Sequence, residues 1–195
     1  VGERLAGATI AIVNKAPMPA SVIAALPELK MVAVAATGTN IVDLEACRAR
    51  GIVVANIPAY AQHTVPEHVM ALLLALSRNL IAWRESVRAG RWQQSEQFCL
   101  FDHPIRDLHG ATLGIIGSGS LGGGVIRLAE AFGMRVLRAE RKGVAEVRNG
   151  YTAFETVLAE ADAISLHCPL TAQTTGLIGE AELRAMKPSA LLINT

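Results

Sequence analysis

The sequence is poor in cysteine and in aromatic residues, and it carries no excess of charge of either sign. Its 195 residues include three cysteines and 4% aromatic residues, and 18 basic against 17 acidic side chains give a formal charge of +1. Cys47, Cys99 and Cys168 form no C-x-x-C pair and no zinc-knuckle spacing, which argues against a disulfide framework and a cysteine-based zinc site. The balanced charge indicates no nucleic-acid or membrane-surface partner. We therefore expect a cytoplasmic chain that uses no metal and binds no nucleic acid.

The sequence also lacks a long uninterrupted apolar run. The run at residues 69–76 ends at Ser77 and Arg78, far short of the roughly 20 residues that cross a bilayer. The opening VGERLAGATIAIVNK does not show the ordered basic, apolar and small-residue regions of a signal peptide. No membrane association is therefore expected. Because 51% of the residues are apolar and only 18% are charged, the composition is nevertheless typical of a folded globular chain.

Short apolar runs, rich in Val, Ile and Ala, alternate with stretches of helical periodicity. Such alternation is typical of parallel strands joined by crossover helices. The runs are apolar throughout, as expected for strands whose two faces are both covered by helices. We predict an α/β fold with strands at residues 9–13, 31–35, 53–56, 112–116, 135–139, 163–167 and 190–194.

A long helix is predicted at residues 65–89, between two groups of strands. Thr64 and Glu67 have the spacing of a capping box, in which each residue's side chain bonds to the other's backbone amide. Pro66 falls in the first turn, where no intrahelical hydrogen bond is lost. Gly90 follows the last periodic residues and is expected to end the helix.

The length of the chain suits one large domain or two small ones, and the long helix favours two. A polar stretch follows the helix at residues 90–97. We therefore predict one lobe over residues 1–92, which includes the helix, and a second lobe over residues 93–195.

A glycine loop joins the predicted strand at residues 112–116 to a predicted helix at residues 121–132. Gly117, Gly119 and Gly122 form the motif G-x-G-x-x-G. In a dinucleotide-binding loop the first glycine permits the tight turn, the second lets the backbone approach a pyrophosphate, and the third lets helix and strand pack closely. The first turn of the helix then offers free amides to the phosphates. The residues between the glycines, Ser118, Ser120 and Leu121, are expected in the same site. A glycine-rich turn without a ligand is the competing interpretation.

An acidic residue stands where such a site needs one. Glu140 lies 18 positions after Gly122, at the end of the next predicted strand, where a carboxylate accepts hydrogen bonds from the adenosine ribose. This carboxylate repels a 2′-phosphate and favours NAD. Arg141 and Lys142 follow at once and could pair with that phosphate, so NADP stays possible, although solvated loop cations are an equally good interpretation of them.

Further motifs occur in order along nearly the whole chain. They are residues 36–44 (ATGTNIVDL), 65–68 (VPEH), 70–74 (MALLL), 98–100 (FCL), 113–122 (LGIIGSGSLG), 139–142 (AERK), 167–171 (HCPLT) and 186–195 (MKPSALLINT). In them the chain resembles the D-isomer-specific 2-hydroxyacid dehydrogenases, within these the glycerate dehydrogenase or hydroxypyruvate reductase branch. The resemblance implies two Rossmann-like lobes, a flavodoxin-like substrate lobe and a doubly wound NAD-binding lobe, both incomplete in this chain.

The resemblance also implies roles for single residues. Thr37, Gly38 and Thr39 would present backbone amides to a substrate carboxylate, although a simple strand-ending turn is the alternative. Cys168 is as easily a small buried apolar residue, and Thr64 has its capping box as a structural reason. The residues that the resemblance places beside the cofactor are Thr64, His167, Cys168, Pro169, Thr174, Asn194 and Thr195.

The reaction that the resemblance implies is hydride transfer from reduced nicotinamide to the keto carbon of a small 2-keto acid. An arginine polarises the substrate, and a histidine oriented by a glutamate supplies the proton. In the family these three residues follow the segment that here ends in Asn194 and Thr195. His63 and His68 do not share a helix face, and His167 resembles a residue beside the cofactor. We therefore expect no catalytic residue and no turnover within residues 1–195.

Two departures from the family pattern accompany the resemblance. The third glycine is followed by Gly123 and Gly124, and a glycine inside a helix costs about 1 kcal/mol relative to alanine. We expect these glycines to loosen the helix that holds the phosphates. The chain also begins without methionine and closes on an apolar, strand-like run, so we interpret it as truncated or partial.

The resulting hypothesis is NAD(P)H-dependent reduction of hydroxypyruvate or glyoxylate by the parent enzyme, a homodimer formed through the long helix and the region of Trp92. One alternative is a nucleotide-sensing binding module, like the corepressors that share this fold. Another is a different dehydrogenase of the family, acting on lactate, phosphoglycerate or formate. The sequences of residues 37–40 and 98–100 argue against a different dehydrogenase of the family.

Overall fold

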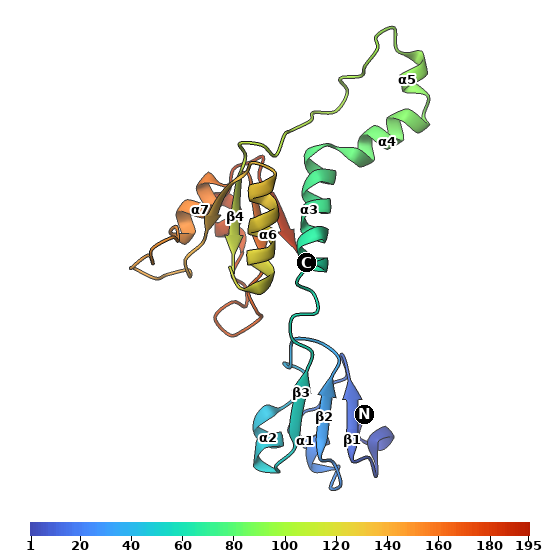
Figure 1. Cartoon of the computed structure of the whole chain (residues 1–195), viewed down its shortest axis with the longest axis vertical. Coiled ribbons are helices and arrows are strands. Elements are labelled where there is room, and N and C mark those ends of the chain that lie inside the picture. The colour runs from blue at the N-terminus through green and yellow to red at the C-terminus, as the bar shows by residue number, and fades with distance from the viewer. The chain divides into compact units, whose positions relative to one another are not determined.

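The computed structural model describes residues 1–195, which form two compact units, Val1–Tyr60 and Ala61–Thr195. Each unit contains its own sheet, and every strand pair in both sheets is parallel (Figure 1). The predicted α/β class is therefore confirmed in both units. All seven predicted strands are present, each with ends within one residue of the predicted ones.

The first unit is built on a three-stranded sheet in the order β1-β2-β3. Its elements are the 3-10 helix η1 (Glu3–Leu5), β1 (Ile10–Val13), α1 (Ala20–Ala24), β2 (Met31–Val34), α2 (Leu44–Ala49) and β3 (Val53–Asn56). Val32 and Val34 of the central strand are buried in one core with Met18 and Ile23. The loop that follows β2 is therefore attached to the most buried strand of this unit.

The second unit is built on a four-stranded sheet in the order β5-β4-β6-β7. Its helices are α3 (Thr64–Ser77), α4 (Leu80–Arg88), α5 (Arg91–Gln94), α6 (Ser120–Ala131), α7 (Phe154–Glu160) and α8 (Glu180–Ala185). Its strands are β4 (Thr112–Ile116), β5 (Arg135–Arg138), β6 (Ala163–Leu166) and β7 (Leu191–Asn194). Strand β4 has β5 on one side and β6 on the other, so the chain reverses its direction of travel across the sheet beside β4.

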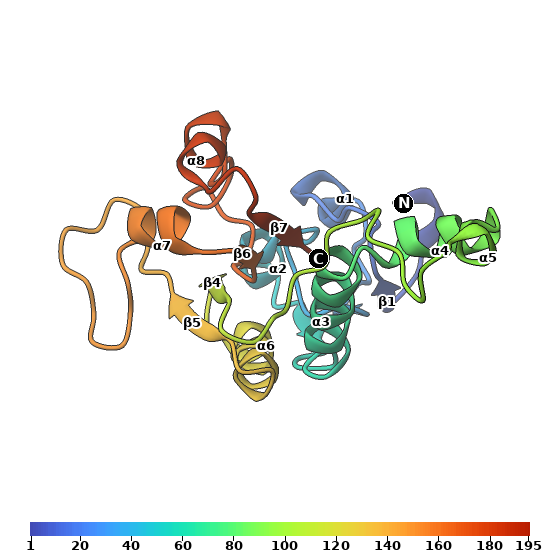
Figure 2. The same ribbon diagram turned by 90° about the horizontal axis from the view of Figure 1, so that it is seen from above.

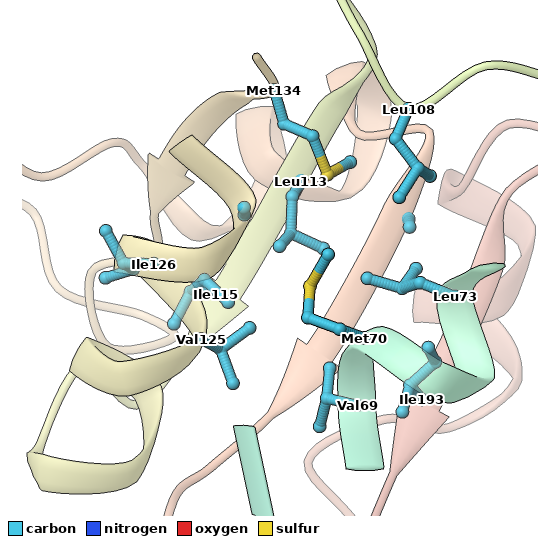
Figure 3. Packing of buried hydrophobic residues seen from close by; sticks show 12 residues of the cluster. Val69, Met70, Leu73, Leu108, Leu113, Ile115, Val125, Ile126, Met134 and Ile193 are labelled. Atoms are coloured by element: carbon cyan, nitrogen blue, oxygen red, sulfur yellow. The ribbon is translucent and has the colours of Figure 1, made fainter. Parts of the chain in front are cut away.

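Both faces of the second sheet are covered by helices, as the uninterrupted apolar runs predict. Figure 2 shows α3 and α6 on one side of the sheet and α7 and α8 on the other. Leu113 and Ile115 of β4 pack into the first core, together with Met70 of α3 and Val125 of α6 (Figure 3). Ile116 belongs to the second core, with residues of α7 and with Met186, which follows α8. Every residue of β4 is buried.

The boundary between the compact units differs from the predicted lobe boundary at residue 92. Helix α3 falls in the second unit, because Val69, Met70 and Leu73 are buried in the core that α6 and the sheet form. The division falls after Tyr60 for this reason. Periodicity predicted the helix, but it gave no information on which sheet the helix packs against.

The predicted single helix over residues 65–89 is wrong, because the structure has two helices there. Helix α3 ends at Ser77, α4 begins at Leu80, and the two are bent by 56°. Between them Asn79 adopts a left-handed conformation with φ of 50°, which asparagine tolerates better than most residues. Gly90 has φ of 75° and follows the end of α4, so its predicted role as a stop is confirmed.

The predicted capping box at the start of this helix is also wrong. The cap position is His63, Thr64 is the first helical residue, and no side chain caps the helix. Thr64 and Glu67 have the spacing of a capping box, but that box requires Thr64 at the cap position, one residue after the cap that the structure has. Thr64 is thus left without the structural role that its capping box would have given it.

No single helix of the chain is long and apolar enough to cross a membrane. The pair α3 and α4 meets the length and composition of a span only when the two are joined across their 56° bend. The apolar side of α3 is buried in the protein core.

Candidate functional site

The three motif glycines meet three different steric situations, each of which matches its expected role. A Cβ atom on Gly117 would lie 2.6 Å from the backbone nitrogen of Cys168, and its φ is 93°. A Cβ on Gly122 would collide with the carbonyl oxygen of Gly117. A Cβ on Gly119 would have no protein atom within 4 Å. Gly117 and Gly122 are therefore required by packing, and Gly119 leaves an open approach to the backbone.

The first turn of α6 provides hydrogen-bond donors beside this open approach. The first amides of an α-helix have no intrahelical acceptor, and here Gly119 at the cap position offers no side chain to satisfy them. Ser120, Leu121 and Gly122 contribute these amides, and the helix dipole adds partial positive charge. A nucleotide pyrophosphate fits this loop in shape and in charge.

The sheet topology brings the predicted cofactor residues to one edge. Gly117 follows β4, Glu140 follows β5, His167 follows β6, and Asn194 ends β7. Because all four strands are parallel, these positions lie at the same carboxyl edge. Gly117 directly adjoins the backbone of His167 and Cys168, at the point where the strand order reverses on either side of β4. Open α/β sheets bind ligands at such a switch point.

Glu140 does not present the free carboxylate that the sequence predicts. Its Oε2 accepts a hydrogen bond from Arg148 Nε at 2.6 Å, and its Oε1 accepts one from Arg148 Nη2 at 2.8 Å. The backbone amide of Arg141 donates a further bond to Oε1 at 2.8 Å. These bonds, with Arg148 the largest cause, lower the pKa of Glu140 from 4.5 to about 2. Arg148 was missed because it lies in an irregular loop with no motif around it.

The two cations that follow Glu140 have different surroundings. Lys142 Nζ lies 2.7 Å from Oε1 of Glu182 on α8, and the pKa of Glu182 is lowered chiefly by this hydrogen bond. Arg141 makes no ion pair in the structure and is exposed. The predicted role of either residue toward a phosphate stays a prediction, and the structure leaves Arg141 the better placed of the two.

His167 is held in a partly buried position at the end of β6. Its Nε2 lies 2.8 Å from the hydroxyl of Ser165, which is fully buried. Burial lowers the pKa of His167 below its usual value, so the imidazole is neutral at pH 7. Its backbone amide donates to the carbonyl of Ile116 at 2.7 Å. The ring is therefore fixed beside the start of the glycine loop.

The segment after His167 forms a turn closed by its own side chains. The Thr174 hydroxyl donates to the carbonyl of Pro169 at 2.6 Å and accepts from the amide of Thr171 at 2.8 Å. Cys168 is a free, half-buried residue packed at the margin of the core with α7, in line with the alternative that it is a small apolar residue. Thr174 thus shapes the turn, and its contact with a cofactor stays a prediction.

The predicted substrate loop lies in the first unit, after the central strand β2. The Thr37 hydroxyl donates to the carbonyl of Ile57 at 2.9 Å, and Asn56 Nδ2 donates to the carbonyl of Thr37 at 2.7 Å. No acceptor within the protein is present for the amides of Thr37, Gly38 and Thr39, and the loop is largely exposed. These amides are available to an anionic ligand. Asn56 was missed because its partner lies 19 residues away.

Gly124 has a packing role that the sequence did not predict, and the expected loosening of α6 by Gly123 and Gly124 stays a prediction. A Cβ on Gly124 would lie 2.5 Å from Cγ of Pro66 and 3.2 Å from the carbonyl oxygen of Gln62. Gly124 therefore permits the close approach of α3, which begins at Thr64. A Cβ on Gly123 would meet no atom within 4 Å, so nothing in the packing requires glycine there.

Comparisons with known proteins show the family of this chain. Residues 70–195 match the family described as D-isomer specific 2-hydroxyacid dehydrogenase, NAD binding domain. The chain is 51% identical to a glycerate dehydrogenase from Methylorubrum extorquens over 99% of this chain and 60% of the relative. It is 35% identical to a hydroxypyruvate reductase from Blautia hydrogenotrophica over 98% of this chain and 61% of the relative.

A solved structure shares the fold as well. It is that of a D-lactate dehydrogenase from Aquifex aeolicus complexed with NAD and lactic acid, with a TM-score of 0.84 and 31% identity over 100% of this chain and 58% of that chain. The chain thus spans about 60% of the length of the curated relatives that it matches.

Proposed function

Because the chain belongs to the D-isomer specific 2-hydroxyacid dehydrogenase family, we propose that its parent enzyme uses NAD(P)H to reduce hydroxypyruvate or glyoxylate to glycerate or glycolate. The family predicted from the sequence motifs is confirmed. The matched domain is an NAD-binding domain, in agreement with the predicted cofactor. The names of the relatives, glycerate dehydrogenase and hydroxypyruvate reductase, support the choice of substrate.

One observation carries the nucleotide part of this proposal. The glycine loop combines two glycines that packing requires, Gly117 and Gly122, with one that packing does not, Gly119. At Gly119 the protein itself leaves room for a side chain, whereas at the two flanking motif glycines it does not. A glycine at such an open position is expected where a ligand approaches the backbone. A plain glycine-rich turn has no reason to leave that one position open.

The residues of this chain would bind and orient the reactants. The amides at the start of α6 would hold the pyrophosphate, and His167 would stand as a neutral imidazole at the carboxyl edge. The amides of Thr37, Gly38 and Thr39 would bind the substrate carboxylate. When bound, the reduced nicotinamide supplies the hydride. We assign no proton donor and no polarising arginine within residues 1–195.

We also propose a homodimer formed through the stretch around α4 and α5. Large apolar side chains on this stretch are exposed, with Phe98 at 90%, Phe101 at 80% and Ile81 at 70%. Leu76, Leu80, Val87 and Trp92 are exposed as well. A contiguous stretch of this kind favours burial against a second copy. The cytoplasmic location, in which Cys47, Cys99 and Cys168 stay free, is part of the same proposal.

Two readouts separate this proposal from its alternatives. We expect residues 1–195 to bind NADH, measured by the change in nicotinamide fluorescence, without oxidising it in the presence of hydroxypyruvate. Robust NADH oxidation by residues 1–195 would contradict the assignment of the catalytic residues.

A corepressor-like module predicts that NADH binding changes the oligomeric state and that the complete gene product gives no turnover. With the complete gene product, a substrate panel of hydroxypyruvate, glyoxylate, pyruvate, phosphohydroxypyruvate and formate with NAD⁺ separates the branches of the family.

A further inference from the structure

The loop between β5 and α7 (Figure 1) carries Arg148, whose side chain donates hydrogen bonds to Glu140, the acidic residue of the proposed nucleotide site. Each carboxylate oxygen of Glu140 accepts two hydrogen bonds: Oε1 from the Arg141 amide and Arg148 Nη2, Oε2 from Arg148 Nε and the Arg148 amide at 3.3 Å. The side chain of Glu140 is only 3% exposed, whereas that of Arg148 is 56% exposed. A carboxylate has about four acceptor positions. Glu140 therefore has none left for a ribose hydroxyl while Arg148 is in place.

Several contacts fix Arg148 in this position. The segment that follows the loop returns to β5, where Thr152 pairs with Ala139 and its carbonyl accepts from the Glu140 amide at 2.8 Å. The Arg148 guanidinium lies 3.9 Å above the ring of Tyr151, a cation–π arrangement. The Tyr151 hydroxyl lies 2.9 Å from the hydroxyl of Ser118. Arg148 is thus tied through Tyr151 to the glycine loop itself.

We propose that Arg148 sets the nucleotide specificity of this site, because it neutralises Glu140 and presents its own donors, so that the site accepts the 2′-phosphate of NADP(H) as well as NAD(H). This inference rests on the proposed function only in so far as the glycine loop binds a dinucleotide. It assigns a role to a residue that lies outside the glycine motif.

The charges around the loop support this role. A free carboxylate at Glu140 would repel a 2′-phosphate, and the ion pair with Arg148 removes that repulsion. Two of the five guanidinium N–H donors of Arg148 are directed at Glu140, and its half-exposed side chain leaves others for a phosphate. Arg141 adds a second exposed cation that forms no ion pair. Lys142 adds none, because Glu182 holds it.

The test compares two probes that differ only in the 2′-phosphate, ADP-ribose and 2′-phospho-ADP-ribose, by isothermal titration calorimetry. For the unaltered chain we expect Kd values within about tenfold of each other, because the carboxylate charge is cancelled. Arg148→Gln is expected to raise the Kd for 2′-phospho-ADP-ribose by at least about tenfold relative to the Kd for ADP-ribose. ADP-ribose itself is expected to bind unchanged or more tightly, because Glu140 regains free acceptor positions.

A matched control removes the same charge elsewhere. Arg184→Gln on α8 also separates an arginine–glutamate pair, with Glu180 at 2.6 Å, and is expected to leave the ratio of the two Kd values unchanged. Glu140→Gln keeps the arginine and is expected to shift the ratio toward 2′-phospho-ADP-ribose, which keeps the test decisive if Arg148→Gln does not fold.

The possible failures are distinguishable. An unchanged ratio in Arg148→Gln, or an unaltered chain that binds ADP-ribose but not its 2′-phosphorylated form, would overturn the role of Arg148 and leave the proposed function intact. A chain that binds neither probe would contradict both.

Discussion

The two loops that follow β2 and β4 are both proposed to bind ligands, yet they are stabilised by different forces. The loop at residues 117–122 is fixed by close contacts, because Gly117 and Gly122 leave no room for a side chain. The loop at residues 37–39 is fixed by hydrogen bonds from distant residues, Asn56 and the carbonyl of Ile57. The glycines that close contacts require can be recognised in the sequence, whereas the hydrogen-bond partners that support residues 37–39 cannot.

The largest effect that tests this comparison is expected from Gly117→Ala. The new Cβ would press on the backbone of His167 and Cys168 at φ of 93°, and we expect a loss of at least about 3 kcal/mol in the free energy of unfolding. The equivalent change in the other loop, Gly38→Ala, places Cβ 3.2 Å from the movable Oδ1 of Asn40, and we expect a loss below about 1 kcal/mol. Urea unfolding measures both. Equal losses would contradict the difference between the loops.

A second pair of variants tests the same principle within α6. Gly124→Ala would force α6 away from Pro66, and we expect it to destabilise the chain by about 1–3 kcal/mol. Gly123→Ala meets open space and is expected to stabilise the chain by up to about 1 kcal/mol, because alanine is the better helix former. Thermal unfolding compares the two. Destabilisation by Gly123→Ala would contradict the difference in packing between the two positions.

A smaller effect is expected from Asn56→Ala. Its amide donates to the carbonyl of Thr37, and loss of one such exposed bond is expected to cost about 1 kcal/mol or less. The more specific expectation is a change in the ¹H–¹⁵N shifts of residues 37–39, with unchanged shifts at residues 117–122. Shift changes of equal size in both loops would indicate a general rearrangement instead of loss of a local support.

The smallest expected change is the titration of Glu140. Its pKa is lowered from 4.5 to about 2, first of all by Arg148, so the ion pair stabilises the fold above about pH 4.5. This contribution is lost as the pH falls toward 2, because the unfolded chain takes up the proton first. The ¹³C shift of the Glu140 carboxyl, followed by NMR, measures the pKa. An ordinary value would show that Arg148 does not hold the carboxylate in solution.

The strands and the glycine loop could be predicted from the sequence because each depends on neighbouring residues. β4 is buried on both faces and reads as one apolar run, and a Cβ on Gly122 would meet Gly117 and Ile115 of the same strand–turn–helix unit. Gly117 is recognised by its place in the motif, although the backbone that it meets belongs to His167 and Cys168. The break at Asn79 could not be predicted in this way, since a single left-handed residue interrupts a periodicity that continues through it. The start of α3 was misplaced by one residue, and the capping box failed with it.

The contacts of the site that could not be predicted all join residues from different parts of the chain. Arg148 reaches Glu140 across an irregular loop, and Asn56 reaches Thr37 from the next strand. Gly124 was predicted only to weaken its helix, because Pro66, for which it makes room, lies in another helix. In each case the residue type was visible in the sequence, but its partner was determined only by the fold.

The most direct test of the nucleotide site is the affinity of Gly119→Ala for NADH, measured by calorimetry beside Gly123→Ala as the control on the same helix. Neither new methyl group meets a protein atom within 4 Å, so both variants are expected to fold. If the pyrophosphate lies against the loop, Gly119→Ala raises the Kd for NADH by at least about tenfold, which corresponds to the loss of one charge-assisted hydrogen bond. Gly123→Ala is expected to leave this Kd unchanged. Unchanged NADH affinity in Gly119→Ala would contradict the assignment of the glycine loop.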